Sequence, residues 1–131
     1  MIFKSVASIN GVISIAYGLV GLVAPAALAS VYDVEITDRE GLVLRSLSAS
    51  YLGLGVLCWV ARGLGDGAAR RAIAIGALAS WGLSLPVAVV GQLAGLFNTL
   101  GWSVVGLQLA FVLGWAWALR ETARSTSRLP A

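Results

Sequence analysis

Arg45 is the residue whose type and position most suggest binding chemistry. A helix that begins at Asp38 would place Arg45 roughly 10 Å along its axis, inside an apolar segment. A guanidinium at such a depth in a membrane is costly unless it finds a partner or reaches the polar boundary. One interpretation is an anion site for a lipid phosphate or a carboxylate. The other, which we favour, is a structural ion pair with Asp38, Asp33 or Glu35.

A second group of polar side chains falls in the middle of the apolar segments. Its members are Tyr17, Tyr51, Trp81 and Gln108. Hydroxyl and amide groups at similar depths could face one cavity and orient a mostly apolar ligand. Such side chains also hydrogen-bond to one another or to nearby serines, as links between membrane helices, and we favour that role.

The residue types that usually carry catalysis are scarce. The chain has no histidine, and its one cysteine, Cys58, allows neither an internal disulfide nor a paired-cysteine metal or redox motif. We expect Cys58 to be a buried structural thiol. No catalytic residue, metal site or cofactor is assigned, and the sequence favours a protein that is not an enzyme.

The composition of the chain indicates the kind of fold that positions these residues. Hydrophobic residues make up 59% of the 131 residues and charged residues 11%, with a mean hydropathy of +0.90. A soluble domain has about a quarter of its residues charged. Because about 20 apolar residues span a bilayer, the pattern predicts one all-α domain over residues 1–131, an integral membrane bundle of four transmembrane helices. The predicted helices cover residues 4–24, 38–62, 70–91 and 99–120.

The helix boundaries carry signals of their own. The first apolar run stops at Pro25, and Thr37 with Glu40 forms a capping box before the second helix. A cleavable signal peptide ending near Ala29 is the alternative for the first run, which is longer than a usual signal core. Asn10 and Asn98 are predicted near opposite ends of the membrane, where Asn98 would cap the last helix.

Basic residues predict the orientation. Seven of the nine fall on the side that holds both termini: Lys4, Arg62, Arg70, Arg71, Arg120, Arg124 and Arg128. Cytoplasmic loops are rich in such residues, so both termini are expected in the cytoplasm. We expect the basic residues to reflect this topology, and we expect no nucleic-acid partner. An aromatic belt would comprise Trp59, Trp115 and Trp117 on this side, and Tyr32 and Trp102 on the other.

Small residues recur at spacings that allow helices to approach closely. The clearest run is Gly106, Ala110 and Gly114 in the last helix. We expect it to pack in the bundle interior, and contact with another chain is the alternative.

Four segments together resemble a known family. They are Asn10-Gly11, the LVAP run at 22–25, the glycine-rich segment at 41–55 (GLVLRSLSASYLGLG), and FNTLGW at 97–102. The chain is similar to DoxX-like proteins and the related small four-helix membrane proteins of bacteria. The resemblance implies a four-helix bundle in the bacterial inner membrane, and it assigns no residue a role.

These observations favour a non-enzymatic accessory or structural subunit of a membrane complex. Its partners would be membrane lipids and either other membrane subunits or further copies of itself. The alternative is a small binding or transport protein for a lipid or other hydrophobic molecule, with an anion site at Arg45.

Overall fold

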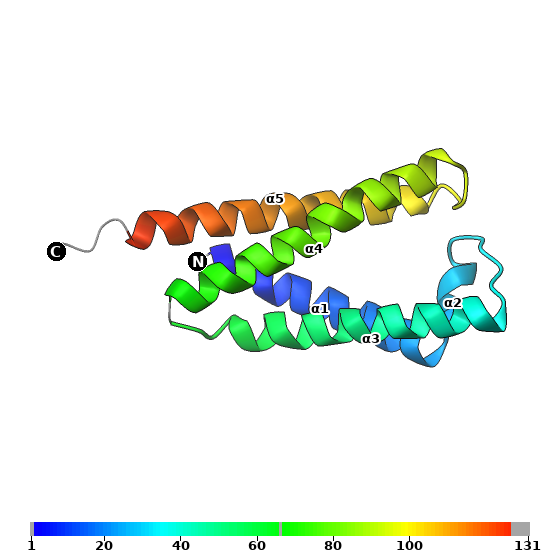
Figure 1. The fold of residues 1–131 in the computed structure, drawn as a ribbon, viewed down its shortest axis with the longest axis horizontal. Coiled ribbons are helices and arrows are strands. Elements are labelled where there is room, and N and C mark those ends of the chain that lie inside the picture. Colours follow the sequence, from blue (N-terminus) through cyan, green and yellow to red (C-terminus); the bar gives the residue numbers. More distant parts are fainter. Residues whose placement is uncertain (1, 66, 127–131) are drawn as a thin grey trace.

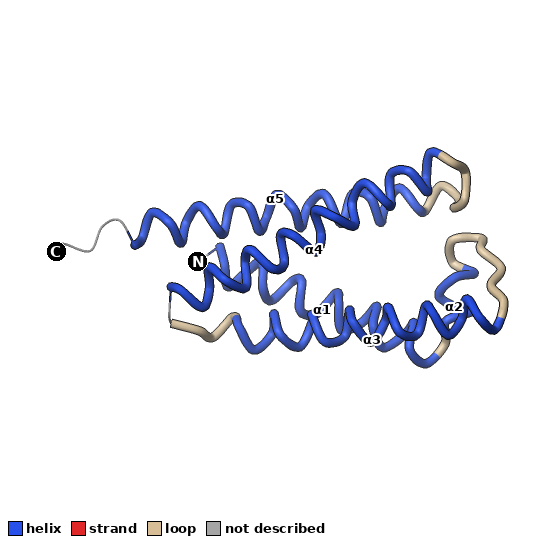
Figure 2. Tube along the Cα trace, in the orientation of Figure 1, coloured by secondary structure: helices blue, strands red, loops and turns tan. Residues whose placement is uncertain are grey.

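The computed structural model describes residues 2–65 and 67–126, and every regular element in this part of the chain is a helix (Figure 2). The long helices are α1 (Ile2–Val23), α3 (Asp38–Ala61), α4 (Gly67–Leu93) and α5 (Gly101–Thr126), and α2 (Pro25–Ser30) is short. The four long helices are each long and apolar enough to cross a membrane. The all-α prediction with four such helices is therefore confirmed. Helix α2 was not predicted; it begins with a proline at its first position, where the missing N–H is no loss.

The helices form two antiparallel hairpins, α1 with α3 and α4 with α5 (Figure 1). At one end lie the N-terminus, the α3–α4 connection and the end of α5; we call this the terminal end. At the other, the α2 end, lie α2 and the α4–α5 connection. The hairpins lie close together near the terminal end and diverge toward the α2 end.

Glycines bring the backbones of α1 and α3 close together. A Cβ placed on Gly11 would lie 3.2 Å from the carbonyl oxygen of Gly55, and one on Gly55 would lie 2.7 Å from the amide nitrogen of Ile15. A Cβ on Gly18 would lie 2.7 Å from the amide nitrogen of Leu52. Only hydrogen in place of a side chain allows this approach, so the first hairpin is held by close backbone packing.

Polar groups define the helix starts at the α2 end. The Thr37 hydroxyl accepts from the Glu40 N–H at 3.4 Å, and the Glu40 carboxylate accepts from the Thr37 N–H at 2.7 Å. The predicted capping box is thus confirmed. Before α5, the Asn98 side-chain oxygen accepts from the Leu100 N–H at 3.0 Å. Both connections are fixed by side chains supplied within a few residues.

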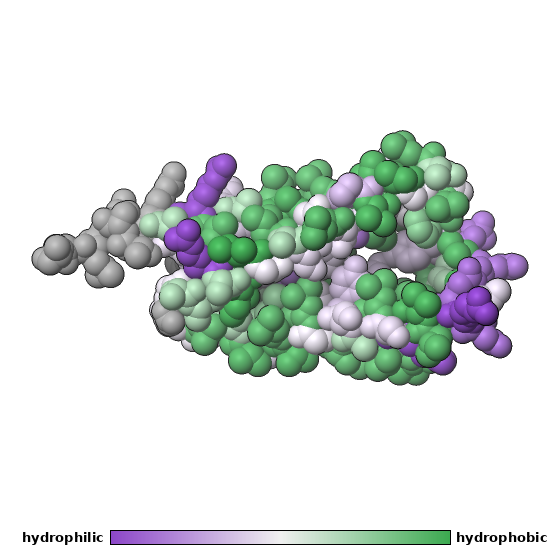
Figure 3. All heavy atoms as spheres, in the orientation of Figure 1, coloured by the Kyte–Doolittle hydropathy of each residue, from purple (hydrophilic) through white to green (hydrophobic). Residues whose placement is uncertain are grey.

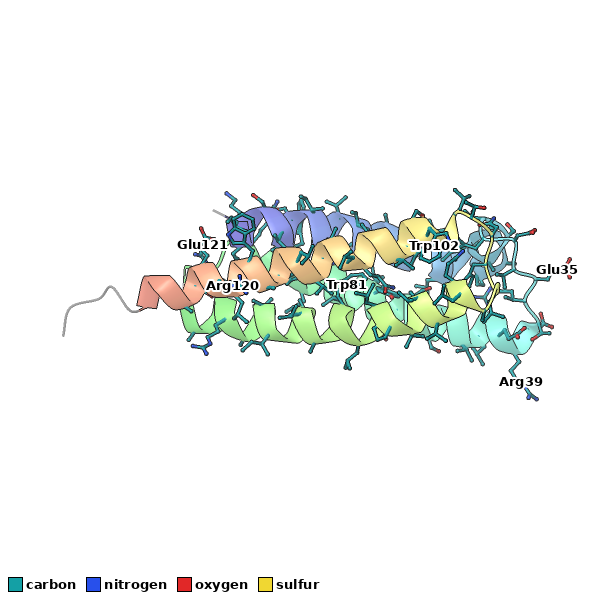
Figure 4. The ribbon with its side chains drawn as sticks, turned by 90° about the horizontal axis from the view of Figure 1, so that it is seen from above. Glu35, Arg39, Trp81, Trp102, Arg120 and Glu121 are labelled. Atoms are coloured by element: carbon teal, nitrogen blue, oxygen red, sulfur yellow. The ribbon has the colours of Figure 1, made fainter. Side chains whose placement is uncertain are left out.

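Hydropathy varies along the length of the molecule. Hydrophilic residues gather at both ends and hydrophobic residues cover the surface between them (Figure 3). Glu35 and Arg39 lie at the α2 end, and Arg120 and Glu121 lie near the terminal end (Figure 4). At most a third of the spanning part of any helix is buried inside the molecule, so most of the apolar surface faces outward. Two of the basic residues used to predict the orientation fall outside the described parts: Arg128 and the side chain of Arg124.

Candidate binding site between the helix hairpins

Asn10 is the centre of a hydrogen-bond network in the bundle core. Its side chain is fully buried, and its oxygen accepts from the indole N–H of Trp81 at 2.9 Å and of Trp115 at 2.8 Å. Its amide nitrogen donates to the Ser14 hydroxyl at 2.7 Å. We call these four residues the Asn10 network. Every hydrogen bond of this network is between side chains, and together they link α1, α4 and α5.

The chemistry of the donors fixes the orientation of this amide. An indole nitrogen can only donate, so both tryptophans must meet the Asn10 oxygen, and the nitrogen must face Ser14. Asn10 was predicted near a membrane boundary, but it bonds to Trp81, which lies midway between the charged ends of the molecule (Figure 4). Trp115 is 0% exposed and does not belong to an interfacial belt, whereas Trp117 is 65% exposed. A buried amide needs hydrogen-bond partners, and that requirement links Asn10 to the two tryptophans.

An aromatic layer lies next to this network. Trp81 stacks on Phe111 with ring centroids 4.8 Å apart, and Tyr51 contacts the Trp81 ring at 5.7 Å. The three rings come from α4, α5 and α3, so they span the two hairpins. Trp81 lies midway between the charged ends (Figure 4). Two members of the predicted mid-membrane group, Tyr51 and Trp81, are therefore in direct contact.

Gln108 is the polar side chain of this region that lacks a partner. It is 6% exposed, and its side-chain oxygen is buried without a hydrogen bond to any described residue. Phe111, Trp115 and Ala118 follow it on the buried face of α5, at intervals of three or four residues. Leaving a buried amide oxygen unpaired costs about 1–3 kcal/mol. The Gln108 oxygen is therefore a buried acceptor whose hydrogen bond no described residue supplies.

Tyr17, the remaining member of the predicted group, bonds elsewhere. Its hydroxyl forms a hydrogen bond with the hydroxyl of Tyr32, just after α2. Burial raises the pKa of the Tyr32 phenol above its ordinary value, and the hydrogen bond to Tyr17 raises this pKa further. Tyr32 is therefore un-ionised at physiological pH and contributes a neutral hydroxyl.

The same segment connects the hairpins at the α2 end. The Asn98 backbone N–H donates to the carbonyl of Tyr32 at 3.1 Å, and the Asn98 side-chain nitrogen donates to the carbonyl of Val31 at 3.0 Å. We call these two bonds the Asn98 tie. The hairpins are thus joined by the Asn10 network on one side of the aromatic layer and by the Asn98 tie at the α2 end. Toward the α2 end the surface between the two hairpins is hollowed, and the hollow contains residues of intermediate hydropathy (Figure 3).

Arg45 does not take part in this region. It is exposed on α3, and no ion pair joins it to Asp33, Glu35 or Asp38, all of which are described. The favoured structural ion pair is therefore absent. Arg45 and the aromatic layer do not form one site in this structure.

The predicted packing run on α5 faces mostly outward. Gly106 and Ala110 are exposed, and a Cβ on Gly106 would meet nothing within 4 Å. A Cβ on Gly114 would lie 3.3 Å from Val6 of α1, so this residue alone of the run meets another helix closely. Close approach of one helix backbone to another instead occurs at Gly11, Gly18 and Gly55.

The described residues contain no cluster of three histidine, cysteine or acidic residues that could hold a metal ion. The region contains hydroxyl, amide, indole and phenyl groups, which are the kinds of group that orient a ligand in a mostly apolar site. No family model, no curated protein and no solved structure matches this chain.

Proposed function

We propose that this chain is a non-enzymatic integral membrane protein that binds a lipid-soluble molecule between its two hairpins. The observation that carries the proposal is the buried, unpartnered oxygen of Gln108 beside the Trp81–Phe111 stack. Membrane ligand sites combine an apolar body with a few convergent polar groups, and this region has both. The hollow between the hairpins offers a route from the surrounding lipid.

We further propose that the bundle crosses a bacterial inner membrane with both termini in the cytoplasm. The support is the charge distribution, with Lys4, Arg62 and Arg71 at the terminal end and Asp33 and Glu35 at the other. Cys58 replaced by serine provides a cysteine-free background. A membrane-impermeant maleimide should then label Glu35→Cys in intact spheroplasts, and label Arg120→Cys only after permeabilisation. The reverse pattern would contradict this orientation.

Binding is tested by fluorescence, because the site contains Trp81. A brominated dodecanol added to the purified protein in mild detergent should quench part of the emission along a saturable curve. Trp81→Phe should lose that saturable part and keep the quenching of exposed Trp102 and Trp117. Native mass spectrometry of protein extracted from its own membrane should show one retained small molecule. Quenching that never saturates would refute the proposed binding function.

An accessory subunit of a membrane complex is a second candidate. The observation that favours it is a set of four exposed glycines within the apolar helices, where an added Cβ would meet nothing within 4 Å: Gly53, Gly76, Gly82 and Gly106. Small residues on outward faces permit close contact with another membrane helix. Native mass spectrometry should then show a partner in fixed stoichiometry that is lost in Gly106→Leu and retained in Leu113→Val. Recovery of the chain alone in several mild detergents would contradict this role.

A further inference from the structure

We infer that Gln108 is the recognition group of this site and that its ligand is a neutral amphiphile whose head carries a hydroxyl. This inference rests on the proposed binding function and gives it a ligand class. It begins from an unfulfilled hydrogen bond: the Gln108 side chain is 6% exposed, and its buried oxygen has no partner among the described residues. Buried polar side-chain atoms nearly always have one. A donor supplied by a ligand would meet this requirement.

The helix register places this oxygen where a ligand head could lie. Gln108 precedes Phe111 by three residues on the buried face of α5, which is roughly 4.5 Å along the helix axis. It therefore lies one turn from the aromatic layer, on the side toward the α2 end, where the hairpins diverge (Figure 1). An apolar body could lie against the aromatic rings and extend through the hollow into the lipid.

The surroundings favour a neutral head over an ionised one. Charged residues lie toward the two ends of the molecule, whereas Trp81 lies midway between them (Figure 4). Arg45, which lies farther into α3 than Arg39, is exposed on the outside of the bundle. An unpaired anion or cation beside Gln108 would be strongly disfavoured, because nothing of opposite charge would compensate its desolvation. The same argument disfavours a phospholipid whose charged headgroup would lie beside Gln108.

The unpartnered atom also sets the polarity of the hydrogen bond. An amide oxygen accepts, so a ligand group that bonds to this atom donates, as an alcohol or phenol does. An ether of the same length has an oxygen but no proton to donate. The site should therefore distinguish an alcohol from its methyl ether, although both partition into detergent or lipid.

The test measures how well three probes compete with a brominated dodecanol for quenching of Trp81. The probes are dodecanol, dodecyl methyl ether and ionised dodecanoate. The wild-type protein should prefer dodecanol to the ether by about tenfold, the scale of one well-formed hydrogen bond within a membrane protein. Dodecanoate should compete least. Gln108→Leu and Gln108→Met should each abolish the preference while still binding both neutral probes.

Gln92 offers a matched control. It is another glutamine whose side-chain oxygen is buried without a partner, and its nitrogen donates to the carbonyl of Asn98 at 3.1 Å. It lies at the far end of α4, outside the aromatic layer. Gln92→Leu should leave the preference for dodecanol unchanged. Folding of each variant is checked by protection of buried Cys58 from a maleimide.

The outcomes separate this inference from the proposed function. If no probe competes in the wild-type protein, the binding function itself fails. If all probes compete but the preference is the same in wild type, Gln108→Leu and Gln108→Met, binding stands and the role of Gln108 is refuted. Tighter binding of dodecanoate than of dodecanol, or a retained phospholipid in place of a neutral amphiphile, would also overturn the inference.

Discussion

The indole nitrogen of Trp115 lies 2.8 Å from the side-chain oxygen of Asn10, although 105 residues separate the two in sequence. Trp81 donates to the same oxygen from α4, at 2.9 Å. One carboxamide on the first helix thus satisfies the indoles of both helices in the second hairpin. Because Asn10 and Trp115 are fully buried, no water replaces these bonds if one partner is removed.

Replacing Asn10 by leucine should therefore destabilise the bundle. The change leaves two buried indole N–H groups unpaired, and we expect the free energy of unfolding to fall by about 1–3 kcal/mol. The measurement uses Cys58, the single cysteine, which is 0% exposed. A thiol-reactive dye should become fluorescent at a lower temperature in Asn10→Leu than in the wild-type protein.

A background that lacks both donors provides the control for this prediction. In the Trp81→Phe, Trp115→Phe protein, adding Asn10→Leu should cost much less, because no indole N–H remains to be orphaned. An equal loss of stability in both backgrounds would show that Asn10 acts through packing alone and would contradict the network.

The α1–α3 interface gives a second prediction with its control on the same helix. Gly55→Ala should lower the melting temperature, because the new Cβ would lie 2.7 Å from the amide nitrogen of Ile15 and the helices must separate. Gly53 has nothing within 4 Å of a built Cβ, and alanine is the better helix former. Gly53→Ala should leave stability unchanged or slightly increased. Equal effects of the two substitutions would refute close packing at Gly55.

The sequence predicted what depends on local pattern. Apolar runs of membrane length gave the four long helices, and the spacing of Thr37 and Glu40 gave the start of α3. These features need only information carried within a few turns. Function, membrane orientation and the likeness to DoxX-like proteins stay predictions.

The features that the sequence did not predict depend on how the helices pack against one another. The prediction placed Asn10 near a boundary from its position in the first apolar run. Its two tryptophan partners are 71 and 105 residues away in sequence, and local pattern does not indicate such partners. Gly106 and Ala110 have the same spacing as a buried packing face yet lie outside. Spacing shows that small residues share a face, but the direction of that face depends on the neighbouring helices.

The Thr37 cap gives a third prediction. Thr37→Ala removes a hydroxyl that accepts from the Glu40 N–H, and loss of such a cap typically costs about 1 kcal/mol. The melting temperature measured through Cys58 should fall accordingly. Ser46→Ala, which removes an exposed hydroxyl bonded to the Leu42 carbonyl within the same helix, should have a smaller effect. A larger loss from Ser46→Ala than from Thr37→Ala would contradict the capping role.

Arg45 gives a fourth prediction, in which no effect is expected. It is exposed and pairs with none of Asp33, Glu35 and Asp38. Arg45→Gln should therefore change neither the melting temperature nor the quenching of Trp81 by a brominated dodecanol. A loss of ligand binding in Arg45→Gln, with the fold intact, would instead restore the hypothesis of an anion site at this residue.

The Asn98 tie gives the last prediction. Asn98→Ala removes the side-chain bonds to the Leu100 N–H and to the Val31 carbonyl, and the second of these is part of the link that joins the hairpins at the α2 end. We expect these ends to separate more widely, because α3 and α4 share few contacts to hold them together. Spin labels on Glu35→Cys and Leu96→Cys in a Cys58→Ser background should show a longer and broader distance distribution when Asn98 is alanine. Tyr17→Phe, which removes one hydroxyl of the neighbouring tyrosine pair and leaves Asn98 intact, serves as the comparison and should move the distribution less. An unchanged distribution in Asn98→Ala would mean that the backbone bond from Asn98 to Tyr32 is sufficient to hold the hairpins together.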